Sequence, residues 1–154
     1  MVTLNEGDRS PAFSGTDQDG KTVSSSAYKG KKLILFFYPA DNTPACTTES
    51  CNLRDNYVLL KQHGFEVLGV SPDDSSSHKK FETKFSLPYR LIADPAHKVI
   101  DKFGVWDEKQ LYGRTYMGLL RTTFVIDEKG IILKIFRRPK NKAHAEEILA
   151  AVPH

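Results

Sequence analysis

Two apolar runs separated by a helical pattern mark the centre of the chain. Residues 32–38 and 65–70 are almost uninterrupted apolar segments, which is typical of strands covered on both faces. Residues 43–63 between them repeat apolar positions at helical spacing, and Gly64 ends this pattern. A strand, a helix and a second strand in succession predict a βαβ unit with a right-handed crossover.

Shorter patterns extend this unit toward both ends of the chain. The turn sequence Asp19-Gly20 predicts a small N-terminal hairpin. Residues 76–85 and 96–103 carry helical patterns, and a short apolar segment at 91–92 between them predicts a further strand.

The last third of the chain adds a second hairpin and a closing helix. Residues 122–127 and 131–136 predict two strands joined by a tight turn. The closing helix is indicated by an apolar stripe of Ala145, Ile148, Leu149 and Val152. This order of elements predicts an α/β protein with a thioredoxin-like fold. Helices would flank a central mixed sheet with an N-terminal hairpin extension, in a single domain over residues 1–154.

The composition is that of an ordinary soluble protein. Hydrophobic residues make up 40% of the 154 positions and charged residues 27%, and the net charge is only +3. So mild a charge argues against a nucleic-acid binder, which would need a concentrated basic face. The longest apolar run, at 33–38, is far shorter than the roughly 18 residues of a membrane helix, and the N-terminus has no apolar targeting core. We therefore expect a soluble, cytoplasmic protein with no membrane partner.

The chain contains two cysteines, Cys46 and Cys51, and five histidines that are scattered singly. In a reducing compartment a pair of cysteines is more often catalytic or redox-active than a permanent crosslink. Two cysteines are also too few for a zinc site unless several histidines converge on them. We therefore expect redox chemistry without a metal or other cofactor.

Cys46 lies at the predicted start of the helix after the first central strand. Thr43 is a good N-cap residue and Pro44 suits the first helical position, so Cys46 falls in the first turn. Backbone N–H groups are unpaired there and the helix dipole favours negative charge. A thiol in this place is predisposed to ionise, and the thiolate is the reactive form. A lone cysteine would more often be a small core residue, but this position and the second cysteine favour a reactive thiol.

Helical geometry separates the two thiols. At about 100° per residue, Leu53, Tyr57 and Leu60 fall within roughly 40° of Cys46, so Cys46 shares the face that packs on the sheet. Cys51 falls about 140° away from Cys46 and points around the side of the helix. The two cysteines are therefore expected to differ in role.

Arg121 can reach the same place if the sheet is mixed. If the strand at 122–127 runs antiparallel to that at 33–38, its first residue lies beside Pro39 and Cys46. Arg121 would then approach the thiol, whereas the alternative is a solvated surface arginine.

The motif Pro39-x-x-x-Thr43-x-x-Cys46 resembles the active-site motif of the peroxiredoxins. The spacing from Cys46 to Cys51 is similar to that of the peroxiredoxin Q, or bacterioferritin comigratory protein, subgroup. Segments 104–106, 112–116 and 121–127 resemble the same subgroup, so the resemblance covers essentially the whole chain. Ala45 and Asp107 depart from it, because many members have glycine there.

The resemblance implies a thiol peroxidase and a role for each motif residue. Cys46 would be the peroxidatic nucleophile that attacks a hydroperoxide, and Cys51 would resolve the sulfenic acid by forming a disulfide with Cys46. Thr43 would hydrogen-bond the thiolate or the peroxide, or act only as a helix cap. Arg121 would hold the thiolate and polarise the peroxide, and Pro39 would shield the thiolate from water or simply end the strand. Thioredoxin, or else glutaredoxin, would reduce the disulfide of a monomeric enzyme.

Two other readings compete with the peroxidase. A thioredoxin-like binding or redox module with a structural disulfide would need more soft ligands to carry a metal, and no histidine or methionine stands close to Cys46 in sequence. A disulfide oxidoreductase usually has Cys-x-x-Cys, which is absent. We assign Glu49 and Trp106 structural roles.

A Cys46–Cys51 disulfide requires a change of structure. Residues five apart on a regular helix are separated by about 7.5 Å along its axis, which places their Cα atoms more than about 8 Å apart. A disulfide needs a Cα separation of about 4.4–6.8 Å. The first turns, from about residue 43 to 53, must therefore unwind before the bond can form.

Overall fold

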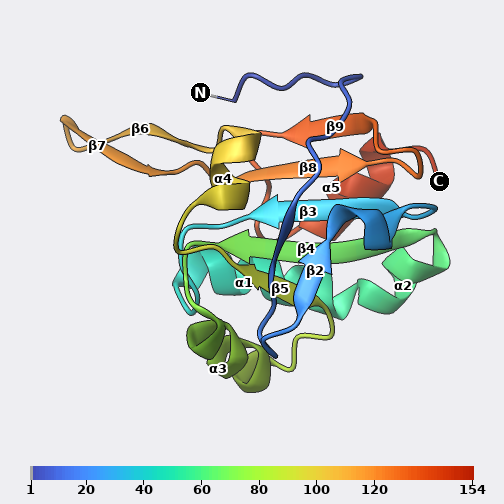
Figure 1. The fold of residues 1–154 in the computed structure, drawn as a ribbon, viewed down its shortest axis with the longest axis horizontal. Coiled ribbons are helices and arrows are strands. Elements are labelled where there is room, and N and C mark those ends of the chain that lie inside the picture. Colours follow the sequence, from blue (N-terminus) through green and yellow to red (C-terminus); the bar gives the residue numbers. More distant parts are fainter. Residues whose placement is uncertain (1) are drawn as a thin grey trace.

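The computed structural model describes residues 2–154, and its centre is a mixed sheet of seven strands (Figure 1). The strands follow one another across the sheet in the order β2-β1-β5-β4-β3-β8-β9. Their bounds are β1 Ser14–Thr16, β2 Thr22–Ser24, β3 Lys32–Phe37, β4 Phe65–Ser71, β5 Arg90–Ala93, β8 Thr122–Ile126 and β9 Ile132–Phe136.

The centre of this sheet is parallel and its edges are antiparallel. β3, β4 and β5 run parallel, while β8 pairs antiparallel with β3, and Phe37 lies opposite Thr122. The N-terminal hairpin β1–β2 extends the other edge by pairing antiparallel with β5. The predicted mixed sheet with an N-terminal hairpin is therefore confirmed.

Helices cover both faces of the sheet (Figure 1). Alternate residues of β3 point to opposite sides, so Leu33, Leu35 and Phe37 pack with α4 while Ile34 and Phe36 join the core under the other helices. The helices are η1 Ser25–Tyr28, α1 Pro44–Asp55, α2 Tyr57–Gln62, α3 Ser75–Phe85, α4 Lys98–Phe103 and α5 His144–Ala151. None of the helices in residues 2–154 has the length and apolar character needed to cross a membrane.

The long helix predicted over residues 43–63 is two helices, and the break is at Asn56. The Asn56 side-chain amide donates to the carbonyl of Asn52 at 2.9 Å and to Glu146 of α5 at 3.2 Å. Side-chain bonds of this kind compete with the regular backbone ladder. The helix pattern at 96–103 likewise begins two residues later than predicted, at Lys98.

The sequence patterns missed one hairpin, formed by β6 (Trp106–Leu111) and β7 (Arg114–Leu119). It projects from the body of the molecule (Figure 1). Its two-residue turn is Tyr112-Gly113, and both residues have positive φ, at 51° and 76°. Tight hairpin turns favour this conformation, but asparagine or aspartate before glycine is the usual sequence signal. Trp106 begins the hairpin and packs on His97, with ring centroids 4.2 Å apart, in keeping with a structural role.

Candidate active site

Cys46 lies in the first turn of α1, directly beyond the carboxyl end of β3. Pro44 is at the start of the helix as predicted, because its fixed φ suits this position and it lacks the N–H that would remain unpaired there. The Cys46 side chain is buried, and Leu53 and Leu60 are fully buried in the same core. The predicted face of the helix is therefore the one that packs on the sheet.

Arg121 reaches the sulfur from the start of β8. Its Nη2 donates to Cys46 Sγ at 3.0 Å, and its Nη1 donates to Glu49 Oε1 at 2.9 Å. The antiparallel pairing of β3 with β8 produces this approach, as the sequence predicted. Burial lowers the pKa of Arg121, but the negative charges of Glu49 and Cys46 outweigh it and the pKa is raised. The guanidinium therefore stays charged beside the thiol.

Glu49 is a component of this site that our sequence analysis treated as structural. It follows Cys46 by three residues on α1, which places both side chains on one face of the helix. Burial raises the pKa of Glu49 to about 7, although Arg121 acts in the opposite direction. The spacing alone could have suggested that Glu49 lies near Cys46, but the sequence carried no sign that Arg121 would bridge the two.

Thr43 occupies the predicted N-cap position, but its side chain does not cap the helix. Its hydroxyl donates to the carbonyl of Ala40 at 3.1 Å, so this hydrogen is used within the loop. The oxygen can still accept a hydrogen bond from a ligand. Pro39, two residues beyond β3, is half-buried at the start of the same loop.

Cys51 is half-buried and lies in the middle of α1. Burial raises its pKa, and the nearby Arg54 partly opposes this effect. Both cysteines are free, and α1 is unbroken from Pro44 to Asp55. The two thiols therefore have different surroundings, as expected: one is buried beside a cation and the other is half-buried on the side of the helix.

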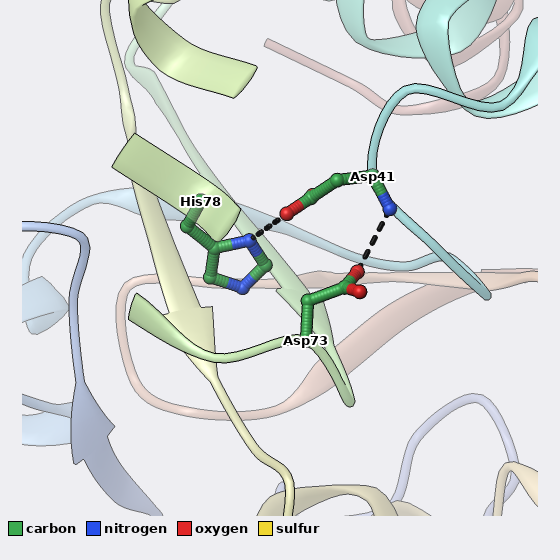
Figure 2. A group of neighbouring side chains, drawn as sticks. All are labelled: Asp41, Asp73 and His78. Carbon is green, nitrogen blue, oxygen red and sulfur yellow. Dashed lines mark hydrogen bonds and ion pairs between the residues drawn. The ribbon is translucent and has the colours of Figure 1, made fainter. Parts of the chain in front are cut away.

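The loop before α1 is held by Asp41, which Figure 2 shows between His78 and Asp73. Asp41 Oδ2 lies 2.7 Å from His78 Nδ1, and the Asp41 backbone N–H donates to Asp73 Oδ2 at 2.8 Å. Asp41 also accepts hydrogen bonds from the hydroxyls of Tyr38 and Ser77, at 2.6 and 2.7 Å. These bonds tie the loop to the ends of β3 and β4 and to α3.

Among the residues that the structure describes, Asp41, Asp73 and His78 form the one group whose ligand atoms could surround a metal ion, all within 4.8 Å of one another. The hydrogen bonds argue for a different use. His78 Nε2 faces the carbonyl of Ile92 at 2.9 Å, so Nε2 carries a hydrogen, and Nδ1 is within hydrogen-bond distance of Asp41 Oδ2. Since both His78 nitrogens are already engaged within the protein, we read the group as an anchor for the loop.

Comparison with known proteins identifies the family of this chain. The model of the AhpC/TSA family matches residues 7–135. The chain is 41% identical to Peroxiredoxin Bcp of Bacillus subtilis over 148 residues, which covers 96% of this chain and 94% of that protein. It is 43% identical to the putative peroxiredoxin Bcp of Haemophilus influenzae over 149 residues, covering 97% and 96%.

Solved structures are similar over nearly the whole chain. A cysteine-to-serine variant of PrxQ from Xylella fastidiosa matches with a TM-score of 0.90 and 30% identity, covering 97% of this chain and 96% of that one. A Xanthomonas campestris bacterioferritin comigratory protein, described for its alkyl peroxide reduction activity, matches with a TM-score of 0.84 and 31% identity, covering 90% and 88%. The buried thiol beside Arg121 thus lies in a chain that belongs to the AhpC/TSA family and groups with its Bcp and PrxQ peroxiredoxins, which are thiol-dependent peroxidases.

Proposed function

We propose that this chain reduces hydrogen peroxide and organic hydroperoxides with Cys46 and closes a Cys46–Cys51 disulfide in each cycle. The observation that carries the proposal is the 3.0 Å contact between Arg121 Nη2 and Cys46 Sγ at the first turn of α1. A thiolate is stabilised there both by the guanidinium and by the helix N-terminus. The alkyl peroxide activity described for the Xanthomonas protein supports including organic hydroperoxides.

The first step is attack of the Cys46 thiolate on the terminal oxygen of ROOH. The O–O bond breaks, a sulfenic acid forms on Cys46, and RO⁻ leaves and takes up a proton as ROH. Arg121 stabilises the negative charge that develops on the oxygens, and the Thr43 oxygen can accept a hydrogen bond from the peroxide O–H. Pro39 limits the access of water to the thiolate.

The second step is attack of Cys51 on the sulfenic sulfur, which releases water and leaves the disulfide. A dithiol reductant then regenerates both thiols. We propose thioredoxin for this role, with glutaredoxin as the other candidate, and a monomer working in the cytoplasm. Two free thiols on one unbroken helix support a catalytic pair over the permanent disulfide of a binding module.

The test is hydrogen peroxide consumption coupled to NADPH through thioredoxin and thioredoxin reductase, with a glutaredoxin system in parallel. We expect Cys46→Ser to abolish the activity. Cys51→Ser should consume about one equivalent of peroxide and leave a trappable sulfenic acid, but turn over poorly. Substantial peroxidase activity in Cys46→Ser would show that the nucleophile is wrongly assigned.

A further inference from the structure

The helix that carries both cysteines also carries a buried hydroxyl, on Ser50. The Ser50 side chain is fully buried, and its Oγ makes no hydrogen bond within the described part of the chain. Ser50 follows Cys46 by four residues, so the two side chains lie on the same, core-facing side of α1. Buried hydroxyls are almost always paired, so this one calls for a physical explanation.

A second hydroxyl on the same helix shows the usual arrangement. Serine and threonine inside a helix commonly donate to the carbonyl four residues earlier. Thr48 does this, and its Oγ1 donates to the carbonyl of Pro44 at 2.9 Å. Ser50 lacks the equivalent bond to the carbonyl of Cys46. The helical form therefore carries the cost of a desolvated hydroxyl, which water satisfies once the helix unwinds.

The backbone of Ser50 is held in the helix by Tyr89. The Tyr89 hydroxyl donates to the carbonyl of Ser50 at 2.7 Å. Burial raises the pKa of Tyr89 well above its ordinary value, so the hydroxyl keeps its hydrogen. In an α-helix the carbonyl of residue 50 already accepts the N–H of residue 54, and its second lone pair is free for the tyrosine. Unwinding of α1 around Ser50 breaks both bonds.

Tyr89 is fixed to the sheet rather than to α1. It immediately precedes β5, and its backbone carbonyl accepts from Gln18 Nε2 at 3.1 Å. Its ring packs edge-on against Phe36 of β3, with ring centroids 5.8 Å apart. The Tyr89 hydroxyl is therefore a donor whose position does not depend on α1, and it stabilises the helical form of the segment between the cysteines.

We propose that Ser50 and Tyr89 control how readily α1 opens for the resolving step: the unpaired Ser50 hydroxyl favours opening, and the Tyr89 hydrogen bond opposes it. The inference rests on the proposed function, in which the Cys46–Cys51 disulfide forms only from the opened helix. In that step the two sulfurs bond, the S–OH bond of Cys46 breaks, and the hydroxyl leaves as water with the Cys51 proton. Ser50 and Tyr89 are positioning residues that act on the sulfurs through the backbone of α1.

The first test is hydrogen exchange at the amides of residues 48–51 in the reduced protein, without peroxide. Ser50→Ala removes the desolvated hydroxyl, so opening should be rarer and exchange about ten-fold slower. Tyr89→Phe keeps the ring in the core and removes one hydrogen bond to the helix, so exchange should be about five-fold faster.

Two matched variants separate these effects from the change of residue type. Thr48→Ala brings a similar gain in helix propensity but removes a hydroxyl that is already bonded, so it should alter exchange by at most about three-fold. Tyr57→Phe removes the hydroxyl of a ring 6.0 Å from that of Tyr89, but this hydroxyl donates to Glu66, so exchange at residues 48–51 should stay unchanged. Circular dichroism checks that each variant is folded.

The second test follows disulfide formation after one addition of hydrogen peroxide, by rapid quenching with a thiol-blocking reagent and mass spectrometry. Conversion of the Cys46 sulfenic acid to the disulfide should be about ten-fold slower in Ser50→Ala and about five-fold faster in Tyr89→Phe. The preceding oxidation of Cys46 should be unchanged in both variants. At high peroxide, Ser50→Ala should accumulate more sulfinic acid than wild type, and Tyr89→Phe less.

The inference is overturned if folded Ser50→Ala exchanges and resolves at wild-type rates, or if Thr48→Ala slows both processes equally. It is also overturned if Tyr89→Phe accelerates neither process. Exchange is measured without peroxide, so its outcome does not depend on the proposed function. Failure of the function itself would instead appear as peroxidase activity that survives Cys46→Ser.

Discussion

Arg121 contacts Cys46 and Glu49 through different nitrogens of one rigid guanidinium. In the proposed mechanism this fork would hold the Cys46 thiolate and present charge where the peroxide oxygens become negative. Glutamine keeps a donor but loses the charge and the second arm. The contribution of Arg121 to the rate therefore depends on the geometry of both contacts.

We predict that Arg121→Gln lowers the rate of Cys46 oxidation by ten-fold or more, since one oriented donor at developing negative charge is worth roughly 10²–10³ in rate. Stopped-flow oxidation of the reduced protein measures this. Arg138→Gln, a change at an exposed arginine, is the control and should behave like wild type. Equal rates for folded Arg121→Gln and wild type would mean that the charge of Arg121 does not act on the reaction.

At the residue scale, the sequence predicted Cys46 in the first helical turn and Arg121 beside it, but it treated Glu49 as structural. The position of Cys46 could be predicted because a threonine at the N-cap position, a proline and a preceding apolar strand fix its place in the chain. Arg121 followed from one assumption, the antiparallel pairing of two strands. Glu49 Oε2 also lies 3.7 Å from His144 Nε2 of the last helix, and nothing local to His144 indicates that α5 packs against α1.

Helix α1 is the element on which the proposed reaction depends most. It holds Cys46 and Cys51 about 7.5 Å apart along its axis, too far for a disulfide. The structure also suggests where unwinding stops. Asp41 is tied to His78 and Asp73 before the helix, and Asn52 accepts from the backbone of Ala145 at 2.7 Å near its end.

We predict that oxidation to the disulfide unwinds residues 44–51 and leaves the anchored loop in place. Hydrogen exchange of the oxidised protein should be faster over these residues than in the reduced protein, with some loss of helical circular dichroism. The Asp41 amide, bonded to Asp73, should stay protected in both forms. Residues 57–62, in α2 beyond the break, serve as an internal reference.

A disulfide-bonded crystal structure with α1 still continuous would contradict this prediction. The rate of unwinding also has a chemical consequence. While Cys51 is held in the helix, the sulfenic acid on Cys46 remains exposed to more peroxide and to irreversible oxidation.

Among the elements, patterns predicted buried strands better than exposed ones. β3 and β4 are covered on both faces and appear as apolar runs. The β6–β7 hairpin is largely exposed, so its residues carry no strong alternation, and its strand pairing is fixed by a Tyr112-Gly113 turn. The break at Asn56 depends on a contact with Glu146 of α5, which the helical spacing of residues 43–63 cannot reveal.

At the scale of the whole molecule, the site joins segments far apart in the sequence. α1 supplies Cys46 and Glu49, the start of β8 supplies Arg121, and His144 of α5 lies 3.7 Å from Glu49. The fold class and sheet were predictable because apolar runs dictate burial. The assembly of the site was only partly predictable, because it depends on how helices pack against one another across the same face of the sheet.

Because Glu49 is buried in this shared core, its protonation should affect the stability of the whole fold. Burial raises its pKa to about 7 in the folded protein, whereas the ordinary value for a glutamate is 4.5. An acid whose pKa is raised by folding contributes stability that is fully present below about pH 4.5 and is lost as the pH rises through about 7. The difference corresponds to a loss on the order of 3 kcal/mol in the free energy of unfolding.

We predict that the stability of wild type relative to Glu49→Gln falls between about pH 5 and about pH 8, because glutamine stays neutral throughout. Denaturant unfolding of both reduced proteins at the two pH values measures it. The lowered pKa of His144 has the opposite sign, since a buried neutral histidine loses stability as the pH falls, but this effect is common to both proteins and largely cancels in the comparison. A difference in unfolding free energy that does not change with pH would mean that Glu49 keeps an ordinary pKa inside the core.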